Sequence, residues 1–163
     1  REPWYENTIF VFVADHVSSE TFAPKTLTPT GNTQIICLIY TPDGSLRGVN
    51  RSVAQQIDLM PTLLGLTGYD RPYFAFGRDV LRETDREPMV SNYAGGTYQG
   101  ITDSLVLFFD GERTLSAYLR SDTLQKNDIS GIRTPALEAA ERDLKARLQQ
   151  YYRHVKQKDY LAE

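Results

Sequence analysis

Asp15 and His16 are the two residues of this chain whose types and spacing point most directly to chemistry. They follow an apolar run, Ile9–Ala14, and ligands of open α/β sheets gather beyond the carboxyl ends of strands. A carboxylate oxygen and an imidazole nitrogen are also ligands that hold Zn²⁺ or Mn²⁺. Spacing alone favours a plainer interpretation, in which Asp15 caps the following turn and His16 is a surface residue.

The other reactive side chains give weaker indications. His154 lies among basic residues near the chain's end, where we expect a solvated residue favoured by a helix C-terminus. Glu20 and Lys25 could line the rim of a site but fit an ordinary solvated loop better. Cys37, the only cysteine, lies in an apolar run, which predicts a buried, inert thiol and excludes an internal disulfide.

Composition excludes several classes of protein. The chain has 163 residues, and its 18 Lys and Arg against 21 Asp and Glu give a formal charge of -3 without a basic stripe. We therefore expect no nucleic-acid partner. The longest apolar run, Ile9–Ala14, is far shorter than the roughly 20 residues of a membrane-spanning helix. The chain begins with Arg1 and lacks a leader pattern, which predicts a piece of a longer protein.

The elements that must position Asp15 and His16 are two apolar runs. Residues 8–14 and 34–40 are rich in β-branched and aromatic residues, which predicts two strands buried on both faces of a mainly parallel sheet. Residues 17–32 form a long connection. Near residues 52–69 we expect a short helix on the sheet, with Asp58 as its cap, Pro61 in its first turn and Gly68 at its C-terminus.

After Pro88 the pattern changes to an antiparallel meander packed by a helix. Four short strand-like runs are separated by turn residues, at 89–93, 97–102, 105–109 and 114–119. Thr134 and Pro135 then begin a helix whose apolar residues recur every three or four positions. Five tyrosines give only a faint indication of a platform for a sugar or a lipid, and at strand and helix spacings we expect them to be core residues; they are Tyr93, Tyr98, Tyr118, Tyr151 and Tyr152. The joint falls at Glu83–Glu87, giving a sheet domain at 1–85 and a small subdomain at 86–163.

Several segments together resemble one family. They are Asn7–His16 (NTIFVFVADH), Ile39–Pro42, Gln56–Gly65 (QIDLMPTLLG) and Phe76–Asp79. In order and spacing they look like the C-terminal part of the sulfatase-like enzymes of the alkaline phosphatase superfamily. The closest resemblance is to the lipoteichoic acid synthase branch of phosphoglycerol transferases. The resemblance implies an α/β fold, the C-terminal portion of an alkaline-phosphatase-like sheet with a flanking helix.

The resemblance also implies a mechanism. It makes Asp15 and His16 ligands of a catalytic divalent metal, Mn²⁺, Zn²⁺ or Mg²⁺, and leaves Asp58 without a catalytic role. The family's threonine nucleophile and acidic metal ligand lie upstream, so we expect an incomplete metal site and an inactive fragment. Val17 departs from the glycine or tyrosine that commonly follows the pair. The implied substrates are phospholipid-type phosphate esters, or sulfate esters, on the extracytoplasmic side of the cell membrane.

Two alternatives remain open. Within the superfamily, a phosphoethanolamine transferase or a true sulfatase would carry the same metal pair. Outside it, a non-enzymatic interaction module would be a stable monomer indifferent to loss of Asp15 or His16. The parallel-sheet interpretation also predicts an exposed edge, through which residues 9–13 or 35–39 pair with a second copy or with the upstream part of the protein.

Overall fold

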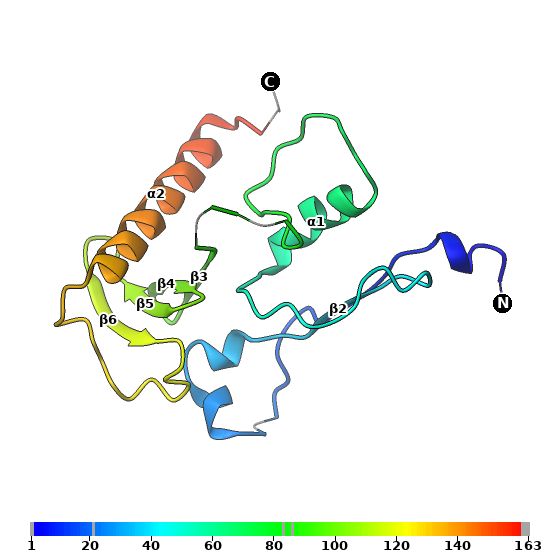
Figure 1. The fold of residues 1–163 in the computed structure, drawn as a ribbon. Helices are drawn as coiled ribbons and strands as arrows, with labels where there is room; N and C mark the ends of the chain where they lie inside the picture. Colours follow the sequence, from blue (N-terminus) through cyan, green and yellow to red (C-terminus); the bar gives the residue numbers. More distant parts are fainter. Residues whose placement is uncertain (1, 21, 83, 86, 161–163) are drawn as a thin grey trace. The chain divides into compact units, whose positions relative to one another are not determined.

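The computed structural model describes residues 2–20, 22–82, 84–85 and 87–160 (Figure 1). The chain divides into two compact units, Arg1–Arg51 and Ser52–Glu163. This division lies after Arg51, whereas the sequence predicts a joint at Glu83–Glu87. Two residues of that predicted joint, Glu83 and Arg86, lie outside the described residues. The predicted domain boundary stays a prediction. No helix of the described part is long and apolar enough to cross a bilayer.

The first unit is built around a two-stranded ribbon. Strands β1 (Phe10–Val13) and β2 (Cys37–Tyr40) pair antiparallel, with Phe10 opposite Tyr40 and Val13 opposite Cys37. Short 3-10 turns complete the unit: η1 (Tyr5–Asn7), η2 (Pro24–Leu27) and η3 (Gly31–Thr33).

The prediction of a parallel pairing for these two runs is therefore wrong. Parallel strands need a crossover of a dozen or more residues, usually a helix. The described residues between β1 and β2 form only η2 and η3, so the chain turns back beside the strand it left. Burial on both faces is also wrong, because Phe12 and Leu38 are 59% and 52% exposed. Cys37, predicted to be buried, is exposed.

The second unit begins with the predicted short helix. The turn η4 (Gln56–Asp58) leads into α1 (Leu59–Leu66), and Gly68 follows with φ +68, the left-handed conformation expected just after a helix end. Asp58 occupies the N-cap position of α1, but its buried carboxylate has other partners. It accepts hydrogen bonds from the backbone N–H groups of Gln55 at 2.9 Å and Arg78 at 2.8 Å. Asp58 therefore joins two segments twenty residues apart.

The predicted meander is confirmed almost residue for residue. Strands β3 (Met89–Ala94), β4 (Thr97–Thr102), β5 (Leu105–Phe109) and β6 (Thr114–Leu119) pair antiparallel in sequence order. Gly95 and Gly96 both have positive φ, as a tight hairpin between β3 and β4 requires.

The helix α2 (Pro135–Gln157) packs on this sheet against β3, β4 and β5 (Figure 1). The Thr134 hydroxyl oxygen caps it by accepting from the Leu137 N–H at 3.2 Å, as predicted. Gly100 leaves room for the helix, since a Cβ there would lie 3.2 Å from Leu144 Cδ2. The core combines apolar residues of the sheet and the helix: Met89, Leu105, Leu107, Phe109, Ala117, Leu137, Ala140 and Leu144.

The start of the second unit is fastened to the meander by Asp103, in the β4–β5 turn. Its Oδ1 accepts from the Val53 N–H at 2.7 Å and from Arg120 Nη1 at 3.1 Å. Its Oδ2 accepts from the Ser52 hydroxyl at 2.9 Å. One carboxylate therefore holds the segment before α1 to the sheet that follows it.

Candidate functional site

Asp15 and His16 lie just beyond the carboxyl end of β1, as predicted. The backbone N–H of Ala14 still donates to the Ile36 carbonyl at 3.2 Å, so the ribbon holds the chain up to the residue before the pair. Both side chains are open to solvent, 90% exposed for Asp15 and 80% for His16. The strand thus presents a carboxylate and an imidazole side by side at its end.

The hydrogen bonds of His16 define which ring nitrogen can bind a ligand. Nδ1 lies 2.7 Å from the Val17 carbonyl oxygen. Because a carbonyl oxygen only accepts, Nδ1 carries the proton in this bond, and in the neutral ring Nε2 carries the lone pair. Metal-bound histidines are commonly held in this way, with the second nitrogen donating to a backbone carbonyl. Val17, the departure from the family pattern, supplies this contact through its backbone.

The two ligand atoms also lie at a suitable separation. His16 Nε2 is 3.7 Å from Asp15 Oδ1. Two ligands at about 2.0–2.2 Å from one cation can span that separation. The same Asp15 oxygen accepts from the His16 backbone N–H at 3.0 Å, which orients the carboxylate. The donor set therefore fits a small divalent cation, with Asp15 and His16 as two of its ligands.

The described part of the chain holds no group of three or more His, Cys, Asp and Glu side chains arranged for a metal. Glu20, the predicted rim residue, lies nearby in sequence, and its backbone N–H donates to the Ser18 hydroxyl at 3.1 Å. Lys25 lies in η2. The origin of any further ligands stays a prediction.

His154, predicted to be a solvated residue, is instead half-buried. Its ring centroid lies 4.7 Å from that of Phe74 and 5.8 Å from that of Phe76. Its Nδ1 lies 2.7 Å from the Asp159 carbonyl oxygen, just past the end of α2. The second histidine is therefore an aromatic packing residue that also fixes the helix end.

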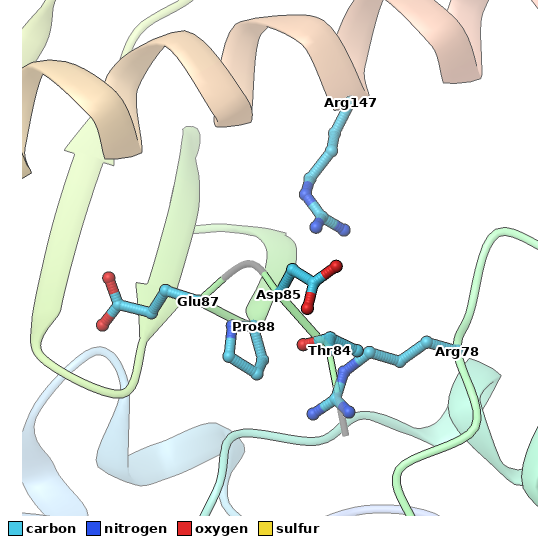
Figure 2. A pocket seen from close by; sticks show the side chains of 6 residues that line it. All are labelled: Arg78, Thr84, Asp85, Glu87, Pro88 and Arg147. Atoms are coloured by element: carbon cyan, nitrogen blue, oxygen red, sulfur yellow. The ribbon is translucent and has the colours of Figure 1, made fainter. Parts of the chain in front are cut away.

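The second unit also has an open pocket of about 340 Å³, which sequence reasoning missed (Figure 2). Its lining residues are Arg78, Thr84, Asp85, Glu87, Pro88 and Arg147. Figure 2 shows the Arg147 guanidinium directed toward Asp85, and Arg78 Nη2 donates to the Val53 carbonyl at 2.8 Å. Glu87 accepts from the Ser104 N–H at 2.9 Å. Two cations and two carboxylates balance here, so the pocket is no simple anion site.

Comparisons with known proteins agree with this fold. Residues 2–69, less than half of the chain, match the family model described as Sulfatase. The crystal structure of a protein in the alkaline phosphatase superfamily from Vibrio parahaemolyticus is similar, with a TM-score of 0.75 and 22% sequence identity. The similarity covers 99% of this chain and 38% of that protein, so the chain spans well under half of that length. No curated protein matches the chain.

These comparisons confirm the predicted α/β fold class, although the strands expected in a parallel sheet form an antiparallel ribbon. The chain has an α/β fold with antiparallel sheets and a C-terminal helix, similar to a portion of an alkaline phosphatase superfamily structure. The similarity to the Sulfatase family model is confined to residues 2–69, whereas the likeness in fold extends over nearly the whole chain. The match at residues 2–69 includes β1, Asp15, His16 and β2.

Proposed function

We propose that this chain is part of a metal-dependent, sulfatase-like enzyme acting on phosphate esters, with Asp15 and His16 as two ligands of its divalent metal. The observation that supports this proposal most directly is the orientation of the His16 ring. Its Nδ1 is hydrogen-bonded to the Val17 carbonyl, and its Nε2 lies 3.7 Å from the Asp15 carboxylate. The ribbon positions the pair, and the backbone around it sets the His16 tautomer. When bound, the metal would activate a nucleophile and neutralise charge on the transferred group.

The finer proposal is a phosphoglycerol transferase of the lipoteichoic acid synthase type. The order and spacing of the four segments named above support it. In this proposal the threonine nucleophile comes from the upstream part of the protein, the chain alone is inactive, and the substrate is a phospholipid-type ester at the extracytoplasmic face of the membrane. A sulfate-ester hydrolase is the second candidate, favoured by the Sulfatase description of the matching family model.

The metal ligands can be tested in this chain because it contains only two histidines. Proton NMR resolves one Hε1 signal for each ring, and His154→Gln assigns them. We expect Zn²⁺ to shift, and Mn²⁺ to broaden, the His16 signal at a concentration at least about tenfold below that needed for His154. Asp15→Asn should remove this preference. Equal responses of both rings, or a preference unchanged by Asp15→Asn, would overturn the assignment.

The reaction needs the longer protein. With the upstream part present, turnover of nitrophenyl phosphodiester and nitrophenyl sulfate separates the two ester classes. Asp15→Asn and His16→Gln should each lower turnover by about 100-fold or more, whereas His154→Gln should leave it unchanged. Full activity in both ligand variants would refute the metal-dependent mechanism.

A further inference from the structure

The C-terminal half of α2 extends beyond the sheet that anchors its first half. At about 1.5 Å per residue, this 23-residue helix is about 35 Å long. The strands have five or six residues and are therefore only about 17–20 Å long, at about 3.3 Å per residue. Its buried residues are Leu137, Ala140 and Leu144, and Leu148 makes the last partly buried contact with the core. Figure 1 shows this half in red, continuing past the sheet. Its outward surface is therefore not part of the core.

Three tyrosines at this end of the unit are exposed, contrary to the prediction that they are core residues, whereas Tyr98 is partly buried and packs against the core. Tyr93 is 62% exposed, Tyr152 53% and Tyr151 47%. The rings connect the β3–β4 hairpin to the helix. The Tyr93 ring is tilted against the Tyr98 ring, with 4.9 Å between their centroids, and the Tyr98 hydroxyl oxygen lies 2.6 Å from that of Tyr152. We call these four residues, Tyr93, Tyr98, Tyr151 and Tyr152, the tyrosine surface.

The same half of α2, together with Lys158 just after its end, is strongly basic. Residues 144–158 contain five Lys and Arg and no Asp or Glu, in a chain whose net charge is -3. Lys145 and Arg147 pair with carboxylates one turn back, Glu141 at 2.6 Å and Asp143 at 2.9 Å. The remaining three, Arg153, Lys156 and Lys158, form no ion pair among the described residues, and Arg153 Nε instead donates to Gln157 Oε1 at 3.1 Å.

A favourable interaction with the helix dipole accounts for cations at a helix C-terminus, but not for exposed rings beside them. Tyrosine has an apolar ring and a polar tip, which suits the boundary between water and lipid. Basic residues beside such rings are typical of surfaces that lie on anionic bilayers. A soluble polyanion would be bound by the cations alone, so the exposed rings favour a lipid surface.

We propose that the tyrosine surface and the basic C-terminal half of α2 dock this unit onto the anionic headgroups of a lipid bilayer. The tyrosine rings lie at headgroup level, and Arg153, Lys156 and Lys158 lie over the lipid phosphates. This inference does not rest on the metal site, because it uses neither Asp15 nor His16.

Vesicle sedimentation of the 163-residue chain tests the proposal. We expect binding to vesicles of phosphatidylglycerol and phosphatidylcholine, at least about tenfold weaker binding to phosphatidylcholine alone, and loss of binding as salt rises above about 0.1 M. Replacing Lys156 and Lys158 by Gln should weaken binding by about 25-fold, at roughly fivefold for each cation. The matched control, Lys126→Gln with Arg142→Gln, removes the same charge elsewhere and should change binding less than twofold.

Separate variants test the contribution of the tyrosine rings to vesicle binding. Tyr93→Ser with Tyr152→Ser should weaken binding by about tenfold or more, while Leu115→Ser, an exposed apolar residue of β6, should not. A Tyr152→Trp reporter in a Trp4→Phe background should be quenched by brominated lipid, which checks ring insertion without removing the ring. Three results would each overturn the proposal. The first is equal binding to neutral and anionic vesicles, and the second is an equal loss of binding in the Lys126→Gln, Arg142→Gln control. The third is binding that the tyrosine variants leave unchanged, together with a Tyr152→Trp reporter that brominated lipid does not quench. The last outcome would instead indicate a soluble polyanion.

Discussion

Replacing Asp103 tests whether the segment before α1 and the meander form one cooperative unit. Asp103 accepts from the Val53 N–H at 2.7 Å, from the Ser52 hydroxyl at 2.9 Å and from Arg120 at 3.1 Å. The Val53 side chain is buried, at 6% exposure, and the hydrogen bond that its backbone N–H donates is partly buried. Loss of the carboxylate therefore leaves a donor that water satisfies poorly.

The three contacts contribute unequally to the free energy of unfolding. A hydrogen bond from a backbone N–H to a carboxylate contributes about 1.5–3 kcal/mol. The Arg120 pair contributes about 0–1 kcal/mol, because both side chains are more than a third exposed. The Ser52 hydroxyl can turn to water and adds about 0.5 kcal/mol. We therefore expect Asp103→Ala to cost about 2–4 kcal/mol, Asp103→Asn about 1 kcal/mol, and Arg120→Met no more than about 1 kcal/mol.

Urea unfolding followed by far-UV circular dichroism measures these costs, because most of the helical signal of the second unit comes from α2, far from Asp103 in sequence. A loss of α2 in the same transition as the rest of the unit would show that Asp103 stabilises the whole of residues 52–163. An Asp103→Ala variant within about 0.5 kcal/mol of the parent chain would refute this reasoning, as would a cost for Arg120→Met equal to that for Asp103→Ala.

Two further predictions concern a close backbone approach and a titrating carboxylate. Gly77→Ala should lower the free energy of unfolding by more than about 2 kcal/mol, because a Cβ there would overlap the Ile57 carbonyl. The control Gly131→Ala, at a position with open space around it, should change that free energy by less than about 0.5 kcal/mol. Equal urea midpoints for the two variants would contradict this prediction. The Ala117 N–H lowers the pKa of Asp128 below its ordinary value of 3.8, with the Ser130 N–H assisting. The ionised Asp128 carboxylate therefore stabilises the folded chain above pH 3.8, and this stabilisation is lost as pH falls through the folded-state pKa. Urea midpoints measured from about pH 6 to 3 should fall less steeply in Asp128→Asn than in the parent chain.

The meander and α2 could be predicted because their signals are local. Gly95 and Gly96 allow a tight turn between β3 and β4, and Thr134 and Pro135 mark the first turn of α2. The apolar spacing of the helix places Leu137, Ala140 and Leu144 on one face, and the structure buries those three residues. Such features are fixed by neighbours a few residues away.

The errors concern features fixed by distant parts of the chain. An apolar run predicts a strand but not its direction, which depends here on the connection between β1 and β2. Cys37 lies in an apolar sequence context yet is exposed, because its burial depends on what packs against the ribbon and not on its neighbours in sequence. His154 looks solvated among basic residues, but Phe74 and Phe76, far away in sequence, pack against it.

The candidate site shows the same division. Asp15 and His16 are neighbours, so their proximity at the end of β1 could be predicted from the sequence. The Val17 carbonyl that fixes the His16 tautomer could not be, because that contact depends on backbone conformation. The lining of the pocket by Arg78 and Arg147 was also missed, since these residues meet only in the folded second unit.

The buried Asp58 carboxylate has a consequence for how this part of the chain can vary in length. By binding the N–H groups of Gln55 and Arg78, it brings the two ends of the intervening stretch together. The loop-closure cost of such a stretch grows only with the logarithm of its length, so each doubling adds about 0.6 kcal/mol. Residues inserted after Tyr69 would lengthen a loop whose ends are already fixed. Asp58 thus makes residues 69–72 a place where related chains can differ in length while α1 and the meander keep their arrangement.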